Sequence, residues 1–282
     1  MSASTPRSPS PVVSVLVLSW NTRDLTLACL EALEREEPRH AREVLVLDNA
    51  SEDGSADAIR ERAAGVCLDV AGENLGYAIG NNRLAQRAEG RYLCLLGSDT
   101  EVRPGAIDAM VDFLEVNPGH AAAAPRLVGP DGIVQRSCMR WPTLGVALVY
   151  DMAWRQWPLL RRVEDRYFCR DLDHVHDTDV DQPPGTCFLV RKEVWEELGG
   201  LDGELWLFFN DVDLCRRIQR AGRRVRYLAG PEVLHHGGAS TGGFDRMVEV
   251  WARDRIRYYE KHYGALGRVL VRSMIRLRAI QE

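Results

Sequence analysis

The sequence predicts an α/β protein with a mostly parallel sheet, flanking helices and a less regular second half. Two observations predict this class. Apolar, β-branched runs alternate with helical segments about four times in the first 100 residues or so, and polar clusters follow three of those runs. A parallel strand pair needs a crossover connection, usually a helix, so this alternation is typical of a parallel sheet.

The first half supplies the regular elements. Residues 12–19, VVSVLVLS, are nearly all apolar, as expected for a strand covered on both faces. A helix follows behind an N-cap at Asn21 or Thr22, with its apolar residues at helical spacing. The series continues with a strand at 43–47 and a helix after it, a strand at 66–70, a helix near 78–89 and a strand at 91–96.

The second half is less regular. We expect a short strand at 186–190, a helix at 192–200, a helix over 210–222 that ends at Gly222, and a strand at 224–230. The chain is divided accordingly into a disordered tail (1–11), a regular first half (12–125), a less regular second half (126–245) and a basic helical segment (246–282).

Composition excludes several classes of protein. The formal net charge of −5 argues against nucleic-acid binding, which requires a cationic surface. No stretch approaches the roughly 18–20 apolar residues of a membrane span, and the tail lacks the apolar centre of a signal peptide. The seven scattered cysteines contain no CxxC pair, so reduced thiols are expected. The sequence therefore predicts a cytoplasmic protein that is soluble or at most peripheral at the inner face of the membrane.

Polar residues cluster where the strands end. Ser19 ends the first run, Asp48 the second, and Asp99 follows the strand at 91–96. Ligands of open parallel sheets bind at the carboxyl ends of the strands, so these residues are expected at one edge. The sequence alone leaves Asp99 open as either a metal ligand or a turn residue.

Five motifs follow one another along the chain: VSVLVLSWNTRDLTLACLEAL, EVLVLDNASEDGS, ENLGYAIGNNRLAQRAEGRYLCLLGSDTEVRPGAI, PGTCFLVRKEVWEELGGLDGELWLFFNDVDLCRRIQRAG and VLHHGGAS. Their order, over roughly residues 12–242, resembles the family 2 glycosyltransferases, in particular their bacterial rhamnosyltransferase-like branch. The resemblance implies the GT-A fold with a nucleotide-binding sheet, a nucleotide-diphosphate sugar donor, a divalent metal (Mn²⁺ or Mg²⁺) and inversion at the anomeric carbon. It makes residues 12–125 the nucleotide-sugar-binding half and residues 126–245 the acceptor-binding and catalytic half.

The resemblance assigns Asp48 to the nucleobase, because a carboxylate can accept the imide N–H of uracil or thymine. In a segment so rich in turn formers, Asp48 could equally form an Asx-turn. Ser19 and Asn21 match positions that line the nucleotide pocket. Trp20, between them, either stacks on the base or fills the core.

Further donor contacts come from loops. Glycines in the loop before the helix near 78–89 allow close approach of the backbone, and the helix N-terminus favours an anion, although such a loop could also only position its helix. The segment PPGTCFLV matches the one that borders the donor sugar and the acceptor in the family, although a strand that needs a close backbone approach would also favour Gly185. The residues that the resemblance assigns to donor binding here are Asn74, Gly76, Asn82, Ser98, Gly185 and Thr186.

The metal is assigned to two residues. Asp99 matches the last acid of the family's Asp-x-Asp type motif, although Gly97 replaces a polar side chain at its start. His235 opens a His-x-x-Gly-x-Ser arrangement with Gly238 and Ser240 that resembles the family's third metal-site element, or is an ordinary loop histidine. Mg²⁺ takes oxygen ligands and retains waters, whereas imidazole suits Mn²⁺ better.

The chemical step requires a base that deprotonates the acceptor hydroxyl. Asp211 matches this base in a segment where the family usually has Glu-Asp, and here Asn210 replaces the Glu. Because Asn210 is neutral, the pKa of Asp211 should be raised less than it would be next to a second carboxylate. Asp213, two residues on, is interpreted as structural, at the opening of the helix.

The resulting expectation is an inverting glycosyltransferase that moves a hexose or deoxyhexose from a UDP- or dTDP-sugar to a glycan, lipid-linked or small-molecule acceptor. A degenerate member that binds nucleotide or glycan without turnover is the alternative. The His- and Asp-rich run at 171–181 is expected to be a solvated loop. The terminal helix, with Arg268, Arg272 and Arg276 on one stripe, could contact an anionic membrane, pack on the domain or form a homodimer.

Overall fold

The computed structural model describes residues 10–63, 65–150, 157–238 and 246–281. The predicted tail therefore lies almost wholly outside the described residues, as does Ser240. The elements run in the order β1 (Val13–Ser19), α1 (Arg23–Glu34), β2 (Arg42–Asp48), α2 (Ser55–Arg62), β3 (Cys67–Val70), α3 (Gly76–Arg87), β4 (Tyr92–Gly97), β5 (Thr100–Val102), α4 (Ala106–Val116), β6 (His120–Val128), α5 (Leu144–Val149), α6 (Pro158–Tyr167), β7 (Thr178–Val180), β8 (Cys187–Arg191), α7 (Lys192–Glu197), α8 (Asn210–Arg220), β9 (Arg224–His235) and α9 (Met247–Gln281).

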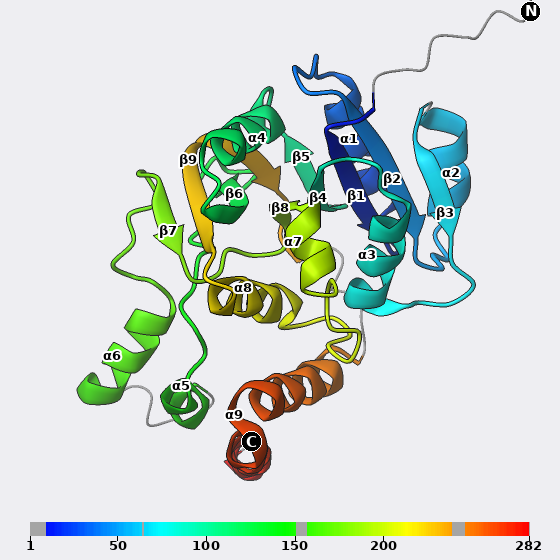
Figure 1. The fold of residues 1–282 in the computed structure, drawn as a ribbon. Coiled ribbons are helices and arrows are strands. Elements are labelled where there is room, and N and C mark those ends of the chain that lie inside the picture. Colours follow the sequence, from blue (N-terminus) through cyan, green and yellow to red (C-terminus); the bar gives the residue numbers. More distant parts are fainter. Residues whose placement is uncertain (1–9, 64, 151–156, 239–245, 282) are drawn as a thin grey trace, which may run out of the picture.

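A single sheet runs through the molecule in the strand order β3-β2-β1-β4-β8-β6-β9-β5, with β7 beside β9 (Figure 1). Strands β1 to β4 are mutually parallel, as predicted. Beyond β4, β8 runs antiparallel to both β4 and β6, and β5 and β7 run antiparallel to β9. The sheet is therefore parallel where the elements alternate regularly and mixed beyond β4.

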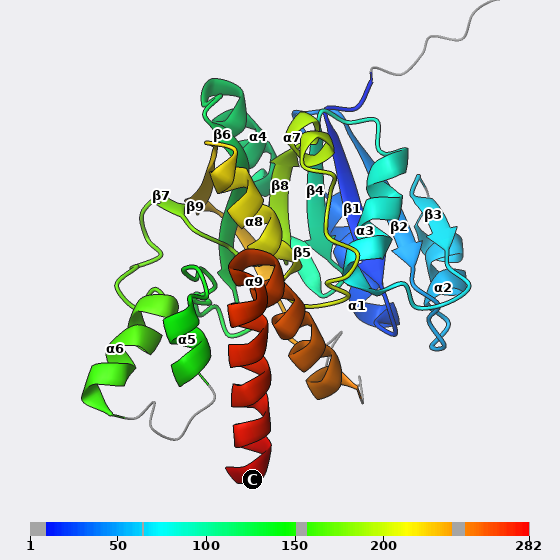
Figure 2. The ribbon, with the colours of Figure 1, turned by 60° about the horizontal axis from the view of Figure 1, so that its bottom comes forward.

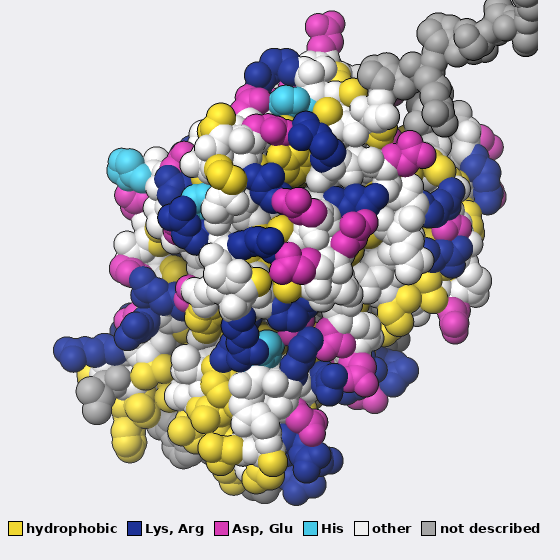
Figure 3. Space-filling view, viewed as in Figure 1, with side chains coloured by type: hydrophobic (Ala, Val, Ile, Leu, Met, Phe, Trp, Pro, Cys, Tyr) yellow, Lys and Arg dark blue, Asp and Glu magenta, His cyan; other side chains and the backbone are white. Residues whose placement is uncertain are grey.

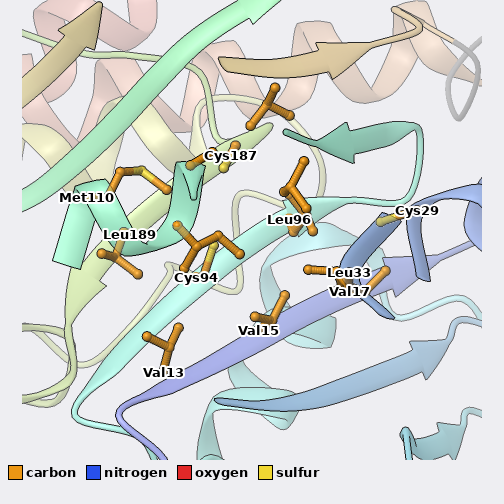
Figure 4. Packing of buried hydrophobic residues seen from close by; sticks show 14 of the residues in the cluster. Val13, Val15, Val17, Cys29, Leu33, Cys94, Leu96, Met110, Cys187 and Leu189 are labelled. Carbon is orange, nitrogen blue, oxygen red and sulfur yellow. The ribbon is translucent and has the colours of Figure 1, made fainter. Parts of the chain in front are cut away.

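Side chains of β1 alternate between two core layers, as a strand buried on both faces requires. Val13, Val15 and Val17 pack in the layer formed with α1, α2 and α4. Figure 4 shows them beside Cys94 and Leu96 of β4. Residues of the opposite parity, such as Leu16, pack in the second layer with α3, α7 and α8. The sheet is thus covered by helices on both faces, which leaves its strand ends as the place for a site.

Helix α9 consists of two segments that meet at Gly264, whose backbone is not helical (φ 65°, ψ −156°). Before the bend, Tyr258 and Tyr259 are buried against α5, α8 and the loop before α8. A Cβ atom on Gly267 would lie 2.4 Å from the carbonyl oxygen of Tyr259, so this glycine permits the close approach of the two segments. Figure 2 shows the second segment extending away from the sheet.

Three sequence predictions require correction. The His- and Asp-rich run at 171–181 is not simply a solvated loop, because Thr178–Val180 form β7 and His174 is buried. The last strand does not end near residue 230 but continues to His235, across a register shift around Pro231. Proline has no N–H for the ladder and is accommodated at such irregularities. The side chain of Thr22 does not cap α1; its hydroxyl pairs with Thr26 and Ser98 instead. None of the helices in the described ranges is long and apolar enough to span a membrane.

Candidate active site

The predicted polar residues meet at one edge of the sheet. Strands β1, β2 and β4 end level with one another, and the end of β9 reaches the same edge through β5. The pairs that set this register are Ser19 with Asp48, Leu18 with Gly97, and Thr100 with His235. Strand pairing thus brings together residues from four separate sequence motifs.

Asp48 is buried at this edge, with 1% of its surface exposed. One carboxylate oxygen, Oδ1, accepts the N–H of Ser51 at 3.1 Å, which is the Asx-turn considered as the alternative role. The other, Oδ2, has no hydrogen-bond partner among the described residues. A buried carboxylate oxygen without a partner is costly, so Asp48 can serve the turn and still receive an N–H from a ligand.

A cavity opens beside these strand ends. Asn74, Gly76 and Ser98, three of the residues predicted to bind the donor, line it, and so does Trp20, which therefore does not belong wholly to the core. Tyr77 and Trp206 line it as well, although the sequence analysis did not single them out. The full lining is Leu18, Trp20, Asn49, Asn74, Gly76, Tyr77, Gly97, Ser98, Trp206 and Leu207.

Gly76 and Trp206 form one wall of this cavity. Gly76 has a φ of +76°, and a Cβ atom there would lie 2.6 Å from the indole of Trp206. The Trp206 carbonyl oxygen accepts the N–H of Tyr77 at 2.7 Å. The loop before α8 is therefore seated on the first turn of α3, and only glycine fits between them.

Ser19 and Ser98 belong to a chain of hydroxyl groups beneath the cavity. The Ser19 hydroxyl pairs with Thr26 at 2.9 Å, Thr26 with Thr22 at 3.1 Å, and Thr22 with Ser98 at 2.9 Å. Ser19 is fully buried and does not line the cavity, whereas Ser98 does. The chain ties α1 to the ends of β1 and β4.

Asn21 and Asn82 lie outside the cavity lining. The Asn21 side chain is exposed and accepts the N–H of Glu52 at 2.8 Å. Asn82 makes two hydrogen bonds with the backbone of Leu201: its Oδ1 accepts the N–H at 2.9 Å, and its Nδ2 donates to the carbonyl oxygen at 2.8 Å. Both amides hold neighbouring loops in place, and their predicted nucleotide contacts remain predictions.

Asp99 and His235 face each other, with Oδ2 and Nε2 3.7 Å apart. The Nδ1 atom of His235 is 2.7 Å from Oε1 of Gln135. Burial lowers the pKa of His235, although the Asp99 carboxylate opposes this shift. A neutral imidazole and a carboxylate at this separation fit a divalent cation. Among the described residues, no group of three or more His, Cys, Asp or Glu side chains could hold a metal ion.

Gly97 lies directly behind this pair. A Cβ atom on Gly97 would sit 2.9 Å from Oδ1 of Asp99, which is closer than packed atoms allow. The absence of a side chain at Gly97 therefore leaves room for the Asp99 carboxylate in this position. His236, the neighbour of His235, pairs with Glu101 at 3.0 Å and is directed to a different partner.

Asp211, at the start of α8, is held against the β8 side of the site. Its Oδ2 accepts the N–H of Gly185 at 2.9 Å, and its Oδ1 accepts the N–H of Val212 at 2.8 Å. Burial raises the pKa of this carboxylate, and the two N–H groups oppose the shift. The Tyr77 hydroxyl donates to the carbonyl oxygen of Gly185 at 2.8 Å, which connects Asp211 to the cavity wall.

Thr186 contributes its backbone here, since its carbonyl oxygen accepts the N–H of Gly97 at 2.8 Å. This bond joins the start of β8 to the end of β4. The segment 185–186 is thus fixed between the metal-ligand candidate Asp99 and the base candidate Asp211 without using its side chains.

Asp213 is fully buried and pairs with side chains of α9, in keeping with the structural role predicted for it. Its carboxylate contacts His262 at 2.8 Å, Arg217 at 2.7 Å and Lys261 at 2.9 Å. Burial alone would raise the pKa of Asp213, but these three groups hold it well below its usual value. The partners come from α9 as well as α8, so the residue is more than a cap on its own helix.

Sequence reasoning missed Trp206 and Leu207 because their place depends on a loop that folds back onto α3. Tyr77 carried a usable signal: it follows Gly76, which was already assigned to the donor site. Asn49 carried one as well, since it extends the polar cluster at Asp48. Its side chain donates to Asn74 at 2.8 Å and accepts the N–H of Leu75 at 2.8 Å.

Residues 14–199 match the sequence family described as "Glycosyl transferase family 2". The chain belongs to this family. The N-acetylglucosaminyl-diphospho-decaprenol L-rhamnosyltransferase of Mycobacterium tuberculosis (strain CDC 1551 / Oshkosh) is 31% identical to this family 2 glycosyltransferase over 243 residues, which are 82% of this chain and 77% of the relative. The O-antigen biosynthesis protein RfbC of Myxococcus xanthus is 27% identical over 82% of this chain, but that match covers only 18% of RfbC.

Solved structures confirm the predicted GT-A fold. The mannosyltransferase PcManGT of Pyrobaculum calidifontis, solved with GDP-Man and Mn²⁺, has a TM-score of 0.60 and 19% identity over 90% of this chain and 64% of that one. GalNAc-T7, solved with UDP, GalNAc and Mn²⁺, has a TM-score of 0.60 and 16% identity over 94% of this chain and 55% of that one. The family 2 chain thus spans less than two-thirds of either structure.

Proposed function

We propose that this glycosyltransferase transfers a sugar, with inversion and the help of a divalent metal, from a UDP- or dTDP-sugar to an acceptor hydroxyl. The observation that carries the proposal is the pairing of Asp99 with His235 at the carboxyl edge of the sheet. Rhamnosyl donors are the first to test, because the 31% identical relative is a rhamnosyltransferase. The two neighbours solved with Mn²⁺ support a metal but share only the fold.

Different side chains are proposed to bind the nucleotide and the metal. Asp48 offers its unpartnered oxygen to the base, and the cavity walls of Trp20 and Trp206 border the nucleotide. Asp99 and His235 would hold Mn²⁺ or Mg²⁺. When bound, such a cation neutralises negative charge on the leaving diphosphate, so that no protein acid is required.

Asp211 is the proposed general base. The acceptor oxygen forms a bond to the anomeric carbon while its proton passes to the Asp211 carboxylate. The bond from the anomeric carbon to the diphosphate breaks, and its electron pair leaves with the nucleotide. Burial raises the pKa of Asp211 and so makes it a better proton acceptor, while Gly185 fixes its orientation. Such a base contributes roughly 10²- to 10⁴-fold.

The test compares wild type with Asp211→Asn for release of nucleotide from UDP- and dTDP-sugars, with and without Mn²⁺. We expect Asp211→Asn to retain nucleotide binding and lose about 10²-fold or more in rate. Asp131→Asn, the same change at an exposed turn, should behave as wild type. Equally slow release by wild type and Asp211→Asn, with UDP still bound, would leave the non-catalytic binding protein as the better account.

A lipid-linked acceptor at an anionic membrane is supported by the surface around the end of α9. Leu266, Val269 and Leu277 are exposed there, and so is Trp157 at the start of α6. Figure 3 shows apolar side chains gathered over this part of the molecule, next to Lys and Arg. Arg268, Arg272 and Arg276 lie on the same segment, and a basic amphipathic helix of this kind suits an anionic surface.

Co-sedimentation with vesicles tests this contact. Binding should require anionic lipid, weaken with salt and fall when Leu266 and Val269 are both changed to Asp. Val116→Asp places the same charge on an exposed position of α4 and should not affect it. Unchanged sedimentation of the double variant, or a dimer that dissociates because of it, would point to a second copy of the chain in place of the membrane.

A further inference from the structure

Gln135 makes two hydrogen bonds with His235. Its Oε1 lies 2.7 Å from the ring atom Nδ1, and its Nε2 donates to the backbone carbonyl oxygen of the same histidine at 3.0 Å. Gln135 is itself fixed to the sheet, because its N–H donates to the carbonyl oxygen of Leu127 on β6 at 2.9 Å. One amide side chain therefore contacts both the backbone and the ring of His235.

These two contacts determine where the imidazole carries its proton. A backbone carbonyl oxygen can only accept, so the amide NH₂ group of Gln135 must face it. The amide oxygen is then left for the ring, and since it too can only accept, Nδ1 of His235 must be the donor. A neutral ring protonated at Nδ1 presents the lone pair of Nε2, the atom 3.7 Å from Asp99.

Asp99 alone would favour the opposite arrangement. A carboxylate facing Nε2 is best satisfied by a proton on that nitrogen, which would make His235 a hydrogen-bond donor and not a metal ligand. The two hydrogen bonds of Gln135 thus keep the lone pair of Nε2 facing the Asp99 carboxylate. A cation between the two groups would stabilise this arrangement.

We propose that Gln135 is a positioning residue that sets the tautomer of His235, so that Nε2 is ready to ligate the divalent cation. The inference relies on the metal-assisted function proposed above and adds a residue that the sequence motifs did not include. Outer-sphere partners of metal-binding histidines typically contribute about 10- to 100-fold to metal affinity.

Two measurements on the intact 282-residue chain test the proposal. In the metal-free protein, ¹⁵N NMR of the histidine rings, assigned with His235→Gln, should show His235 protonated at Nδ1. In Gln135→Met, which keeps the length but removes both hydrogen bonds, the form protonated at Nε2 should gain. The Kd for Mn²⁺ in the presence of UDP, measured by calorimetry, should rise about 10- to 100-fold in Gln135→Met.

Two further variants separate positioning from general stability. Gln135→Glu retains the acceptor for Nδ1 and should keep both the tautomer and a Kd within a few-fold of wild type. Glu101→Gln removes the carboxylate partner of the neighbouring His236 and should leave the Kd for Mn²⁺ unchanged. Wild-type His235 protonated at Nε2, or an unchanged Kd in Gln135→Met, overturns the inference alone. Failure of wild type to bind Mn²⁺ overturns it together with the proposed metal dependence.

Discussion

The Asp254 carboxylate of α9 holds the main chain of Leu207, a residue of the cavity wall 47 positions earlier in the sequence. Its Oδ2 accepts the N–H of Leu207 at 2.9 Å and that of Phe208 at 3.0 Å, and Asp254 is fully buried. The loop that carries Trp206 is thus held on one side by α9 and on the other by the first turn of α3. A helix outside the residues that match the family therefore supports part of the cavity wall.

Asp254→Ala should loosen this loop, because it leaves two backbone N–H groups without their acceptor. Each such loss costs about 1–3 kcal/mol, and we expect the Kd for UDP to rise about tenfold or more. Calorimetric titration with UDP measures this. Glu249→Ala removes an exposed carboxylate from the same helix and serves as the control. Equal UDP affinity in Asp254→Ala and the control would show that the loop holds its position without α9.

Asn210→Asp tests how the neighbour of Asp211 tunes the base. Asp211 acts when deprotonated, so the rate is present above its pKa and lost below it. Burial already raises this pKa above the ordinary value of about 3.9. A second carboxylate next to it should raise it further, which moves the acid limb of kcat/KM up by about one pH unit or more.

The matched control is Gln219→Glu, which adds a carboxylate to the same helix at an exposed position. Its pH profile should follow that of wild type. If the acid limb of Asn210→Asp does not move, Asp211 is not the group that this limb reports.

Gly76→Ala should disturb the cavity wall more than its backbone strain explains. Gly132 has the same φ of +76° and nothing within 4 Å of its missing Cβ, so Gly132→Ala measures the strain alone, about 1–2 kcal/mol. In Gly76→Ala the methyl group meets Trp206, which should cost about 1–3 kcal/mol more and weaken UDP binding. Urea denaturation and UDP titration of both variants test this. Equal losses of stability would mean that the indole moves aside freely.

Asp213→Asn should lower the free energy of unfolding by about 3–5 kcal/mol at pH 7, because Arg217 and Lys261 lose their buried carboxylate partner. The folded-state pKa of Asp213 lies below the unfolded value near 3.9. Its contribution is therefore fully present above that pH and is lost as the pH falls through the folded-state pKa. Denaturation curves from pH 7 downward should show the gap between wild type and Asp213→Asn closing below about pH 4. A constant gap would assign the stability to packing.

Elements with a strong local pattern could be predicted from sequence. The runs of β1, β2 and β4 and the helix spacing of α1 and α8 follow from residues close in sequence. Strand β6 was not predicted: its Ala121–Ala124 stretch would favour a helix by propensity alone, and its strand state depends on its place between β8 and β9. Local preference was overridden there by burial in the sheet.

The same distinction applies to the site. Asp48, Asp99 and Asp211 sit in short motifs, and the edge where they gather follows from strand direction. Trp206, Gln135 and Asp254 take their places through contacts with residues about 50 to 130 positions away. No local pattern encodes such contacts.

The bend at Gly264 also fixes an orientation. Before it, α9 supports the cavity wall through Asp254; after it, the helix carries exposed Leu266 and Val269 away from the sheet. The turn depends on Gly264 for its backbone angle and on Gly267 for the close approach to Tyr259. If the second segment of α9 lies on a bilayer, the bend at Gly264 would determine the height of the cavity above the lipid. That height would set how long an anchored acceptor must be to reach the cavity.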